Sequence, residues 1–292
     1  MTILRVHHRT EYRYKYPVLP GPHRLMCRPR DSHDLRLLDT GLAISPQPSE
    51  LRWLHDVFGN SVAVATFVDE AEELVFDSTF RAEHFPLPER TLVIDDYAVT
   101  LPLSYSASEE VDLGSCKARH YPDPEHKLDA WVKSLLETIP GNKTLDVLTA
   151  MIAAIKVEFI YRRREEVGVQ TPVETLELKS GSCRDYAVFM MDAVRFLGLA
   201  AQFVSGYLYD EALVDAGDGL VGGGATHAWI QVYLPGVGWV EFDPTNALVG
   251  GRNLIRVAVA REAAQAAPLV GSFTGNPDDF LAMQVTIDVT AE

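Results

Sequence analysis

The segment Gly181-Ser182-Cys183-Arg184-Asp185-Tyr186-Ala187 begins a stretch with the periodicity of an amphipathic helix. Apolar residues recur after the cysteine at spacings of three and four, and polar residues occupy the positions between them. The apolar positions are Tyr186, Ala187, Met190, Ala193, Val194 and Leu197. Gly198 follows, and glycine is common just past the end of a helix. We therefore predict a helix that begins at Cys183 and stops before Gly198.

A cysteine in the first turn of a helix lies where a negative charge is stabilised. The thiolate is the nucleophilic form of cysteine, and a free thiol with a pKa of about 8.5 is mostly protonated at neutral pH. Unpaired backbone N–H groups and the helix dipole favour a charged sulfur there, and later the oxyanion of a tetrahedral intermediate. Cys183 is therefore a candidate nucleophile. The alternative is a buried structural cysteine, which is the commoner fate of a free cysteine.

The other two cysteines lack this setting. Gly114-Ser115-Cys116 repeats the same tripeptide, but the residues after it have no apolar periodicity and soon reach Pro122. We predict that Cys116 lies in a loop, within an irregular segment from Ser104 to Pro124. Cys27 is predicted to lie in a strand. Three cysteines, an odd number, fit a reducing compartment better than a disulfide framework.

Two predicted strands follow the helix and carry a histidine and an aspartate. The residues from Thr226 to Leu234 alternate between two faces, and His227 lies on one of them. Pro235-Gly236-Val237-Gly238 has the composition of a turn, and Trp239 to Asp243 returns as the next strand. An earlier strand is predicted from Ala201 to Tyr209. We therefore expect the histidine and the aspartate on adjacent antiparallel strands.

The register of this hairpin decides whether the two side chains can meet. If Leu234 pairs with Trp239, Asp243 points away from the face of His227. If Leu234 pairs with Gly238 across a three-residue loop, Asp243 becomes a diagonal neighbour of His227, roughly 7–8 Å away between backbones. We predict the second arrangement, with an odd-length loop or a bulge at residues 235–238.

Cys183, His227 and Asp243 form a candidate catalytic triad. The cysteine would attack a carbonyl carbon, the histidine would take the thiol proton and later give it to the leaving amine, and the aspartate would orient the imidazole. Taken singly, the histidine could be a strand-end residue with local hydrogen bonds, and the aspartate a turn residue before proline. Their order and settings together favour the triad.

At these residues the chain resembles the transglutaminase-like superfamily of papain-like cysteine enzymes, in particular its prokaryotic branch. Three motifs carry the resemblance: Gly-x-Cys-x-Asp-x-Ala at 181–187, His-Ala-Trp at 227–229 and Trp-x-x-Phe-Asp-Pro-Thr at 239–245. Residues 4–12 and the turn Asp56-Val57-Phe58-Gly59-Asn60 are similar to the β-rich module that begins such proteins. One departure is Ala260-Arg261-Glu262, where relatives often have Gly-Arg-Asp.

The resemblance implies an α+β fold, in which the nucleophile's helix packs on an antiparallel sheet, preceded by a mainly β N-terminal domain. It also implies cysteine-dependent acyl transfer on amide bonds through an acyl-enzyme. Members hydrolyse peptides, crosslink glutamine to amines, deamidate or have lost catalysis, and a fold does not choose among these. We expect an enzyme acting on a peptide or protein substrate, with hydrolysis favoured over transglutamination or deamidation. The alternatives are a non-catalytic peptide- or protein-binding module on the same fold and an acyltransferase that uses acetyl-CoA.

The composition is that of an ordinary globular protein, with 292 residues, 47% hydrophobic and 23% charged. The net charge of −15 argues against nucleic acid and anionic membranes as partners, and favours basic or neutral substrates. There is no apolar run long enough to span a membrane and no signal peptide, so a cytoplasmic location is expected. No cofactor and no metal are expected, since the chain has neither a Cys-x-x-Cys pair nor a calcium-loop spacing of acids.

The chain divides into two predicted domains. Residues 1–105 alternate short strand-like runs with proline-containing turns and predict an all-β module. Residues 106–292 form the predicted core with a C-terminal extension, and its first helices are expected at 124–139 and 144–159. The glycine-rich stretch from Asp215 to Gly224 is either a lid over the cleft or a plain surface loop.

Three smaller predictions concern residues outside the triad. Tyr161 and Gln170 are candidates for a second oxyanion hydrogen bond. The basic run Arg162-Arg163-Arg164 is interpreted as a solvated loop or helix end. His7 and His8 should point to opposite faces of a strand, which makes them a poor metal clamp.

Overall fold

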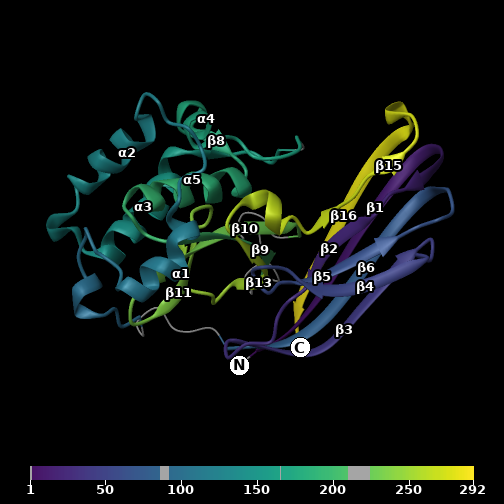
Figure 1. The fold of residues 1–292 in the computed structure, drawn as a ribbon, viewed down its shortest axis with the longest axis horizontal. Helices are drawn as coiled ribbons and strands as arrows, with labels where there is room; N and C mark the ends of the chain where they lie inside the picture. The colour runs from purple at the N-terminus through teal and green to yellow at the C-terminus, as the bar shows by residue number, and fades with distance from the viewer. Residues whose placement is uncertain (1, 86–91, 165, 210–223) are drawn as a thin grey trace.

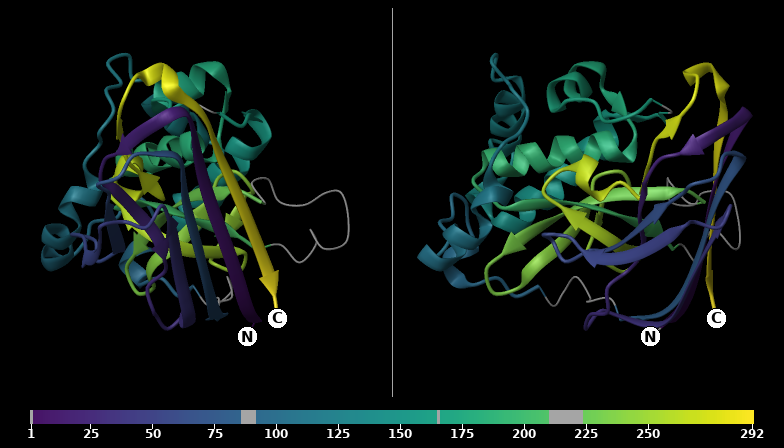
Figure 2. Two further views of the ribbon diagram at one scale, coloured as in Figure 1. Left: turned by 90° about the vertical axis from the view of Figure 1, so that its right-hand side faces the viewer. Right: turned by 45° about the vertical axis from the view of Figure 1, so that its right-hand side comes forward.

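The computed structural model describes residues 2–85, 92–164, 166–209 and 224–292. These residues form three layers: a group of helices, a central five-stranded sheet, and a β-sandwich on the other side of that sheet (Figures 1 and 2). The predicted fold class, an α+β core with a mainly β N-terminal part, is confirmed. None of the helices in the described ranges is both long enough and apolar enough to cross a lipid bilayer.

The central sheet has the strand order β12-β11-β10-β9-β13, and all neighbouring strands are antiparallel. The three middle strands agree with the predicted strands to within one residue at either end. The bounds are β9 (Ala201–Leu208), β10 (Thr226–Leu234), β11 (Gly238–Asp243), β12 (Leu248–Val249) and β13 (Leu254–Ala260).

The hairpin between β10 and β11 has the register that brings the histidine and the aspartate close. Leu234 pairs with Gly238, so the loop has three residues and Asp243 comes opposite Trp229. Gly236 and Gly238 have φ values of 87° and 90°, which glycine adopts without strain. The predicted odd-length loop is confirmed, and the alternative register does not occur.

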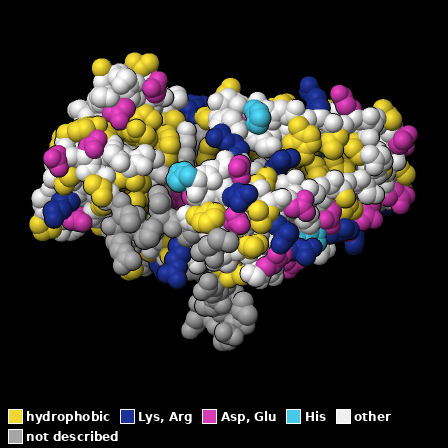
Figure 3. Space-filling model, turned by 90° about the horizontal axis from the view of Figure 1, so that it is seen from below, with side chains coloured by type: hydrophobic (Ala, Val, Ile, Leu, Met, Phe, Trp, Pro, Cys, Tyr) yellow, Lys and Arg dark blue, Asp and Glu magenta, His cyan; other side chains and the backbone are white. Residues whose placement is uncertain are grey.

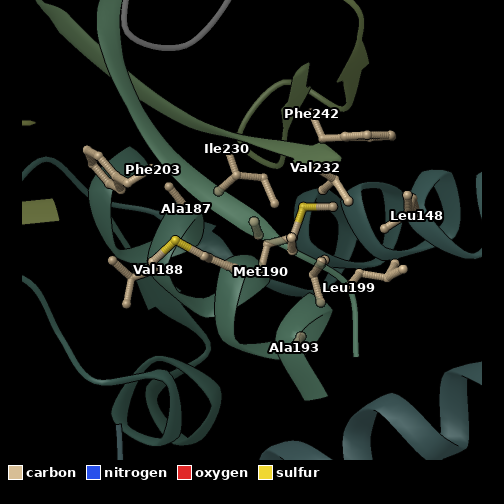
Figure 4. Close-up of a cluster of buried hydrophobic side chains, with 14 of the residues drawn as sticks. Leu148, Ala187, Val188, Met190, Ala193, Leu199, Phe203, Ile230, Val232 and Phe242 are labelled. Carbon is tan, nitrogen blue, oxygen red and sulfur yellow. The ribbon is translucent and has the colours of Figure 1, made fainter. Parts of the chain in front are cut away.

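Helix α5 (Cys183–Phe196) is the predicted helix that begins at the cysteine, and it packs across β10 and β9 (Figure 4). Gly198 follows its end with a φ of 80°, as expected for a helix stop. The centre of the contact between helix and sheet is apolar and buried; it includes Ala187, Met190, Phe203, Ile230 and Val232. Burying each large side chain contributes about 1.5–3 kcal/mol, so this contact fixes the helix against the strands that carry the histidine and the aspartate.

In the described ranges four more α-helices surround α5: α1 (Ala107–Lys117), α2 (Lys127–Leu136), α3 (Thr144–Glu158) and α4 (Pro172–Leu178). The helices α2 and α3 confirm the two that the sequence predicted. The two-residue strands β7 (Ile160–Tyr161) and β8 (Ser180–Gly181) pair in parallel just before α5. Short 3-10 turns lie at Asp96–Ala98, Pro140–Asn142, Ala263–Ala266 and Pro277–Asp279.

The loop prediction for Cys116 is wrong, because this cysteine lies in helix α1. The hydroxyl of Ser106 accepts a hydrogen bond from the N–H of Glu109, and the carboxylate of Glu109 accepts one from the N–H of Ser106. This capping box starts a helix whose apolar periodicity is too weak to recognise. Leu113 and Cys116 face the core and are buried. The segment predicted as irregular therefore contains about three helical turns.

The N-terminal module is a sandwich of two antiparallel sheets. One sheet has the order β15-β1-β6-β3, with β16 beside β1, and the other has the order β14-β2-β5-β4. Cys27 lies in β2, as predicted, and is buried between the sheets. The strands contributed by the first part of the chain are β1 (Thr2–Pro20), β2 (His23–Arg28), β3 (Leu35–Ser45), β4 (Glu50–His55), β5 (Ser61–Thr66) and β6 (Ala71–His84).

The C-terminal segment returns to this sandwich. Strand β14 (Leu269–Val270) pairs with β2, β15 (Phe273–Thr274) pairs with the end of β1, and β16 (Phe280–Ala291) runs along β1. Figure 1 shows β16 and β1 side by side and both chain ends at the same side of the molecule. The domain boundary at residue 105 stays a prediction. The C-terminal extension, which we assigned to the core, supplies strands to both sheets of the N-terminal module.

One edge of the sandwich presents apolar side chains to solvent. On the edge strand β4, Leu51, Trp53 and Leu54 are 40%, 44% and 38% exposed. Figure 3 shows hydrophobic side chains gathered toward the sandwich end of the lower face, among charged ones. The helical core, in contrast, keeps its large apolar side chains from α5 inside.

The module and the core are joined by an apolar and an ionic contact. Tyr207 of β9 and Ile255 of β13 are buried against three residues of the module, Leu4, Val6 and Phe80. Beside them, Arg256 of β13 lies 3.1 Å from the carboxylate of Asp34 in the module and 3.0 Å from that of Glu241 in β11. The sandwich therefore packs against strands β9 and β13 of the central sheet.

The side chain of Asn60 extends the central sheet by one hydrogen-bonded pair. Its Nδ2 donates to the carbonyl oxygen of Val259 at 2.6 Å, and its Oδ1 accepts from the N–H of Val259 at 2.9 Å. A carboxamide has the same donor and acceptor as a peptide group, so it covers the edge of β13 as a neighbouring strand would. Asp56 holds Asn60 in place by accepting from its backbone N–H and from its Nδ2.

Replacing Asn60 with alanine is expected to lower the free energy of unfolding by about 2 kcal/mol, because an unsatisfied buried polar group costs about 1–3 kcal/mol. Urea denaturation followed by circular dichroism measures this. Asn60→Asp keeps the acceptor but removes the donor and faces Asp56 with a like charge, so it should destabilise at least as much. A change below about 0.5 kcal/mol in both variants would contradict the assigned contact.

Candidate active site

Cys183 is the first residue of α5 and comes directly after the short strand β8. The chain enters the helix at Ser182, which has an extended backbone (φ −88°, ψ 175°). The first N–H groups of a helix have no partner inside it, so those of Cys183 and Arg184 remain for a ligand near the sulfur. Cys183 as a whole residue is 7% exposed and is therefore buried.

His227 and Asp243 form a buried pair on the neighbouring strands β10 and β11. Nε2 of His227 lies 2.8 Å from Oδ2 of Asp243, and both side chains are fully buried. Oδ1 of Asp243 accepts from the N–H of Thr245 at 2.9 Å, and Oδ2 accepts from Nδ2 of Asn246 at 2.8 Å. These bonds fix the carboxylate, and the carboxylate in turn fixes the imidazole ring.

The other ring nitrogen of His227 is left for the thiol of Cys183. Nε2 is bound to Asp243, and Nδ1 is buried without a hydrogen-bond partner in the described part of the chain. The Cys183 thiol and the His227 imidazole are close enough for each to shift the pKa of the other. The structure therefore brings the three predicted residues together in the order Cys183, His227, Asp243. Their catalytic role stays a prediction.

The charge state of the three groups follows from their contacts. Burial alone would raise the pKa of the Cys183 thiol, but hydrogen bonding to His227 and its positive charge lower that pKa overall. Burial alone would lower the pKa of His227, but the charge and hydrogen bond of Asp243, together with Cys183, raise it to about 10. The pKa of Asp243 is lowered by His227 and Asn246 in spite of burial. These shifts favour a thiolate on Cys183, an imidazolium on His227 and a carboxylate on Asp243.

Asp185 holds the turn that carries the nucleophile. Its Oδ2 accepts from the backbone N–H and from the hydroxyl of Ser182, both at 2.8 Å. Its Oδ1 accepts from Nη1 of Arg164 and from the backbone N–H of Gln170, both at 2.7 Å. The carboxylate is fully buried. Sequence analysis treated Asp185 only as a polar helix position, although a serine followed three residues later by an acid at a helix start is the signal of a capping box.

Gly181 leaves the space that this carboxylate occupies. A Cβ at this position would lie 2.8 Å from the Cβ of Asp185 and 3.1 Å from Oε1 of Gln170. The interpretation of the basic run as solvated is wrong for Arg164, which turns inward to its ion pair with Asp185. Arg162 and Arg163 are exposed. The partner of Arg164 lies 21 residues later in the chain, so no local pattern in the run announces it.

Tyr161 lies beside the reactive sulfur. The parallel pairing of β7 with β8 places Tyr161 opposite Gly181. Burial, together with the charge and hydrogen bond of Cys183, raises the pKa of the Tyr161 hydroxyl to about 12, so this group stays a neutral donor. Oε1 of Gln170 accepts from the hydroxyl of Thr175 at 3.2 Å. The oxyanion role of Tyr161 and Gln170 stays a prediction.

Gly206 is a residue of the site that sequence analysis missed. The ring of His227 stacks on Trp229, with ring centroids 5.8 Å apart and an interplanar angle of 26°. Gly206 pairs with His227 from β9, and a Cβ there would lie 2.8 Å from the Trp229 ring and 2.0 Å from the carbonyl oxygen of Ile255. A glycine inside a strand marks such a close approach, so the signal was present in the sequence.

Two further predictions concern other parts of the chain. Residues 210–223 lie outside the described residues, and the lid-or-loop prediction for Asp215 to Gly224 falls almost entirely on them. His7 and His8 point to opposite faces, as predicted. Nε2 of His7 lies 3.0 Å from Asp77 on the more exposed face, whereas His8 is buried with Nδ1 2.8 Å from the Tyr207 hydroxyl.

Two family profiles match the chain. The bacterial transglutaminase-like N-terminal region matches residues 4–83, and the transglutaminase-like superfamily matches residues 133–244. The chain belongs to the transglutaminase-like superfamily. Members of this superfamily are usually enzymes. The second match contains all three residues of the candidate triad.

This transglutaminase-like protein is similar to uncharacterised mycobacterial proteins over nearly its whole length. It is 28% identical to one from Mycobacterium tuberculosis over 303 residues, which covers 98% of this chain and 91% of the relative. It is 25% identical to one from Mycobacterium leprae, with 93% of each covered. A solved structure from Cytophaga hutchinsonii, described as a candidate cysteine protease, matches with a TM-score of 0.69 at 18% identity and covers 99% of this chain and 90% of that chain. This likeness shows a shared fold.

Proposed function

We propose that this protein transfers the acyl group of an amide to water, with Cys183 as the nucleophile, so that the net reaction is hydrolysis of a peptide bond. The observation that supports this most is the buried arrangement of the three side chains, in which His227 lies between the Cys183 thiol and the Asp243 carboxylate. Burying charged groups costs several kcal/mol each, and well-packed apolar residues would serve stability equally well. A low-pKa thiol beside an oriented imidazolium is useful for nucleophilic catalysis.

In the proposed reaction the Cys183 thiolate attacks the carbonyl carbon of the amide, and the carbonyl electron pair moves to oxygen. The free N–H groups in the first turn of α5, with the Tyr161 hydroxyl as a further candidate donor, stabilise the oxyanion. As the oxyanion collapses, the C–N bond breaks and His227 gives its proton to the leaving amine. His227 then takes a proton from water, whose oxygen attacks the thioester. The acid leaves, and the thiolate and the imidazolium are restored.

The proposed substrate is a peptide or protein. Nucleic acid and membrane surfaces are not proposed as partners, because a net charge of −15 is unfavourable for binding polyanions. The cytoplasmic location remains a proposal based on the sequence.

The proposed function is tested with a mixed peptide library incubated with the native protein and with Cys183→Ala, each with and without the primary amine cadaverine. Mass spectrometry separates the possible products. Hydrolysis creates new peptide termini, transglutamination adds the amine to glutamine, and deamidation converts glutamine to glutamate. We expect new termini with the native protein and none with Cys183→Ala.

The absence of any product that depends on Cys183, together with retention of peptides by both forms, would contradict the proposal. That result would favour the non-catalytic peptide-binding module. If the amine is added and no new termini appear, Cys183 would still be the nucleophile, but the acyl acceptor would be an amine and not water.

A further inference from the structure

The surroundings of Cys183 are basic in a chain whose net charge is −15. Between residues 120 and 250 the sequence has five arginines, Arg162, Arg163, Arg164, Arg184 and Arg195, and the first four belong to the segments that meet at the nucleophile's turn. The basic run lies directly beside this turn, because the N–H of Arg162 donates to the carbonyl oxygen of Gly181 at 2.9 Å. The arginines are therefore concentrated at one place in the core.

Among these arginines, Arg163 is the one whose charge acts on the hydroxyl of Tyr161. Tyr161 pairs with Gly181, two residues before the nucleophile, and the charge of Cys183 acts on the same hydroxyl. Arg162 and Arg163 are both exposed, and Arg164 is occupied by its ion pair with Asp185.

Within the described ranges no carboxylate is paired with Arg163 or with Arg184. The two buried carboxylates of the site are already committed, Asp185 to Arg164 and Asp243 to His227. Nη2 of Arg184 donates to the backbone carbonyl oxygens of Arg164 and Glu166, at 3.5 and 3.4 Å. Two guanidinium groups beside the nucleophile thus remain available to a bound anion.

We propose that Arg163 is a specificity-determining residue, and that the preferred substrate carries a carboxylate close to the amide that Cys183 attacks. The carboxylate would come from an aspartate, a glutamate or a chain end, since the planar guanidinium binds this group through two parallel hydrogen bonds. This inference rests on the proposed function, because it names the substrate class of the same site. It replaces the expectation of basic or neutral substrates, since charges more than about 8–10 Å away are screened at physiological salt and local charges dominate.

Iodoacetate and iodoacetamide provide the test, because both alkylate a thiol by displacing iodide and they differ only in a carboxylate against an amide. The rates of labelling at Cys183 are measured by mass spectrometry at pH 7 and low salt. The proteins are the native chain, Arg163→Glu and the matched control Arg162→Glu, which makes the same change in net charge at the neighbouring exposed arginine.

We expect the ratio of the iodoacetate rate to the iodoacetamide rate to fall about fivefold in Arg163→Glu and less than about twofold in Arg162→Glu. Adding 1 M salt should reduce the difference, since the Debye length then falls to about 3 Å. In the peptide library, Arg163→Glu should also lose any preference for acidic residues beside the cleaved bond.

A ratio that stays within about twofold of the native value in Arg163→Glu, or that falls equally in both variants, would overturn this inference. The proposed function would survive that outcome, because iodoacetamide would still label Cys183 rapidly. Labelling of Cys183 by iodoacetamide no faster than an ordinary thiol would instead overturn the proposed function, and this inference with it.

Discussion

Replacing His227 with alanine is expected to slow the alkylation of Cys183 at pH 7 by roughly one to two orders of magnitude. The imidazolium lowers the pKa of this thiol against the effect of burial, so its removal leaves a buried thiol whose pKa lies above the ordinary value. Only a small fraction would then be thiolate at neutral pH. In the native protein the larger thiolate fraction raises the alkylation rate, but part of this advantage is lost because a thiolate of low pKa is intrinsically a weaker nucleophile.

The alkylation rate of Cys183 should depend on pH differently in the native protein and in His227→Ala. In the native protein the pKa of Cys183 is lowered and that of His227 is raised to about 10, and both shifts favour the ion pair. Labelling should therefore stay fast well below pH 8.5 and decline only when acid protonates the sulfur. In His227→Ala the whole profile should move to higher pH.

The measurement is the rate of iodoacetamide labelling between pH 5 and 10, resolved by site with mass spectrometry. Cys27 and Cys116 are buried internal references, and burial raises the pKa of Cys27 to about 11. His55→Ala, which alters an exposed histidine on β4, is a matched control and should leave the profile unchanged. Identical profiles for the native protein and His227→Ala would contradict the ion pair.

Replacing Asp185 with alanine is expected to lower the free energy of unfolding by about 3–5 kcal/mol. The change would remove the buried partner of the Arg164 guanidinium and leave it with the exposed carboxylate of Glu166 at 3.5 Å, and breaking one side of a buried ion pair costs about this much. It would also remove the acceptor used by Ser182 and by the backbone N–H of Gln170. The turn that carries Cys183 should loosen as well. The alkylation rate of Cys183 should therefore change even where the rest of the protein stays folded.

Asp146→Ala is the control for this prediction. Asp146 also lies in the first turn of its helix, α3, where it interacts with the helix dipole, but it is exposed and holds no buried arginine. Its replacement should cost less than about 1 kcal/mol. Urea denaturation of both variants gives the comparison. Equal losses would mean that Asp185 acts only as a helix-end charge.

The strongest sequence predictions concerned features that are local in the chain. The apolar period after Cys183 predicted α5, and the alternation from Thr226 onward predicted β10. The register of the hairpin was predicted from the need to bring Asp243 near His227, and the three-residue loop of the structure meets that need. These features depend on backbone geometry over a few residues, which the sequence expresses directly.

The errors concerned contacts between distant residues and elements with weak periodicity. Arg164 seemed solvated because nothing near it in the chain identifies its partner Asp185. Helix α1 was missed because a capping box and not an apolar stripe starts it, which also misplaced Cys116. The turn that ends in Asn60 was recognised only as a motif, and its bond to Val259, 199 residues away, explains why asparagine is needed there.

The pairing of β16 with β1 also constrains the order in which the protein can fold as it is synthesised. Leu4 pairs with Ala291, so β1 can complete this pairing only after all the residues between them have been made. Contacts of such long sequence separation are formed slowly, because the loop between them must first be closed. Until then β1 has an unpaired strand edge, which is prone to join other chains. Nascent chains of this protein should therefore depend on chaperones until β16 has been made.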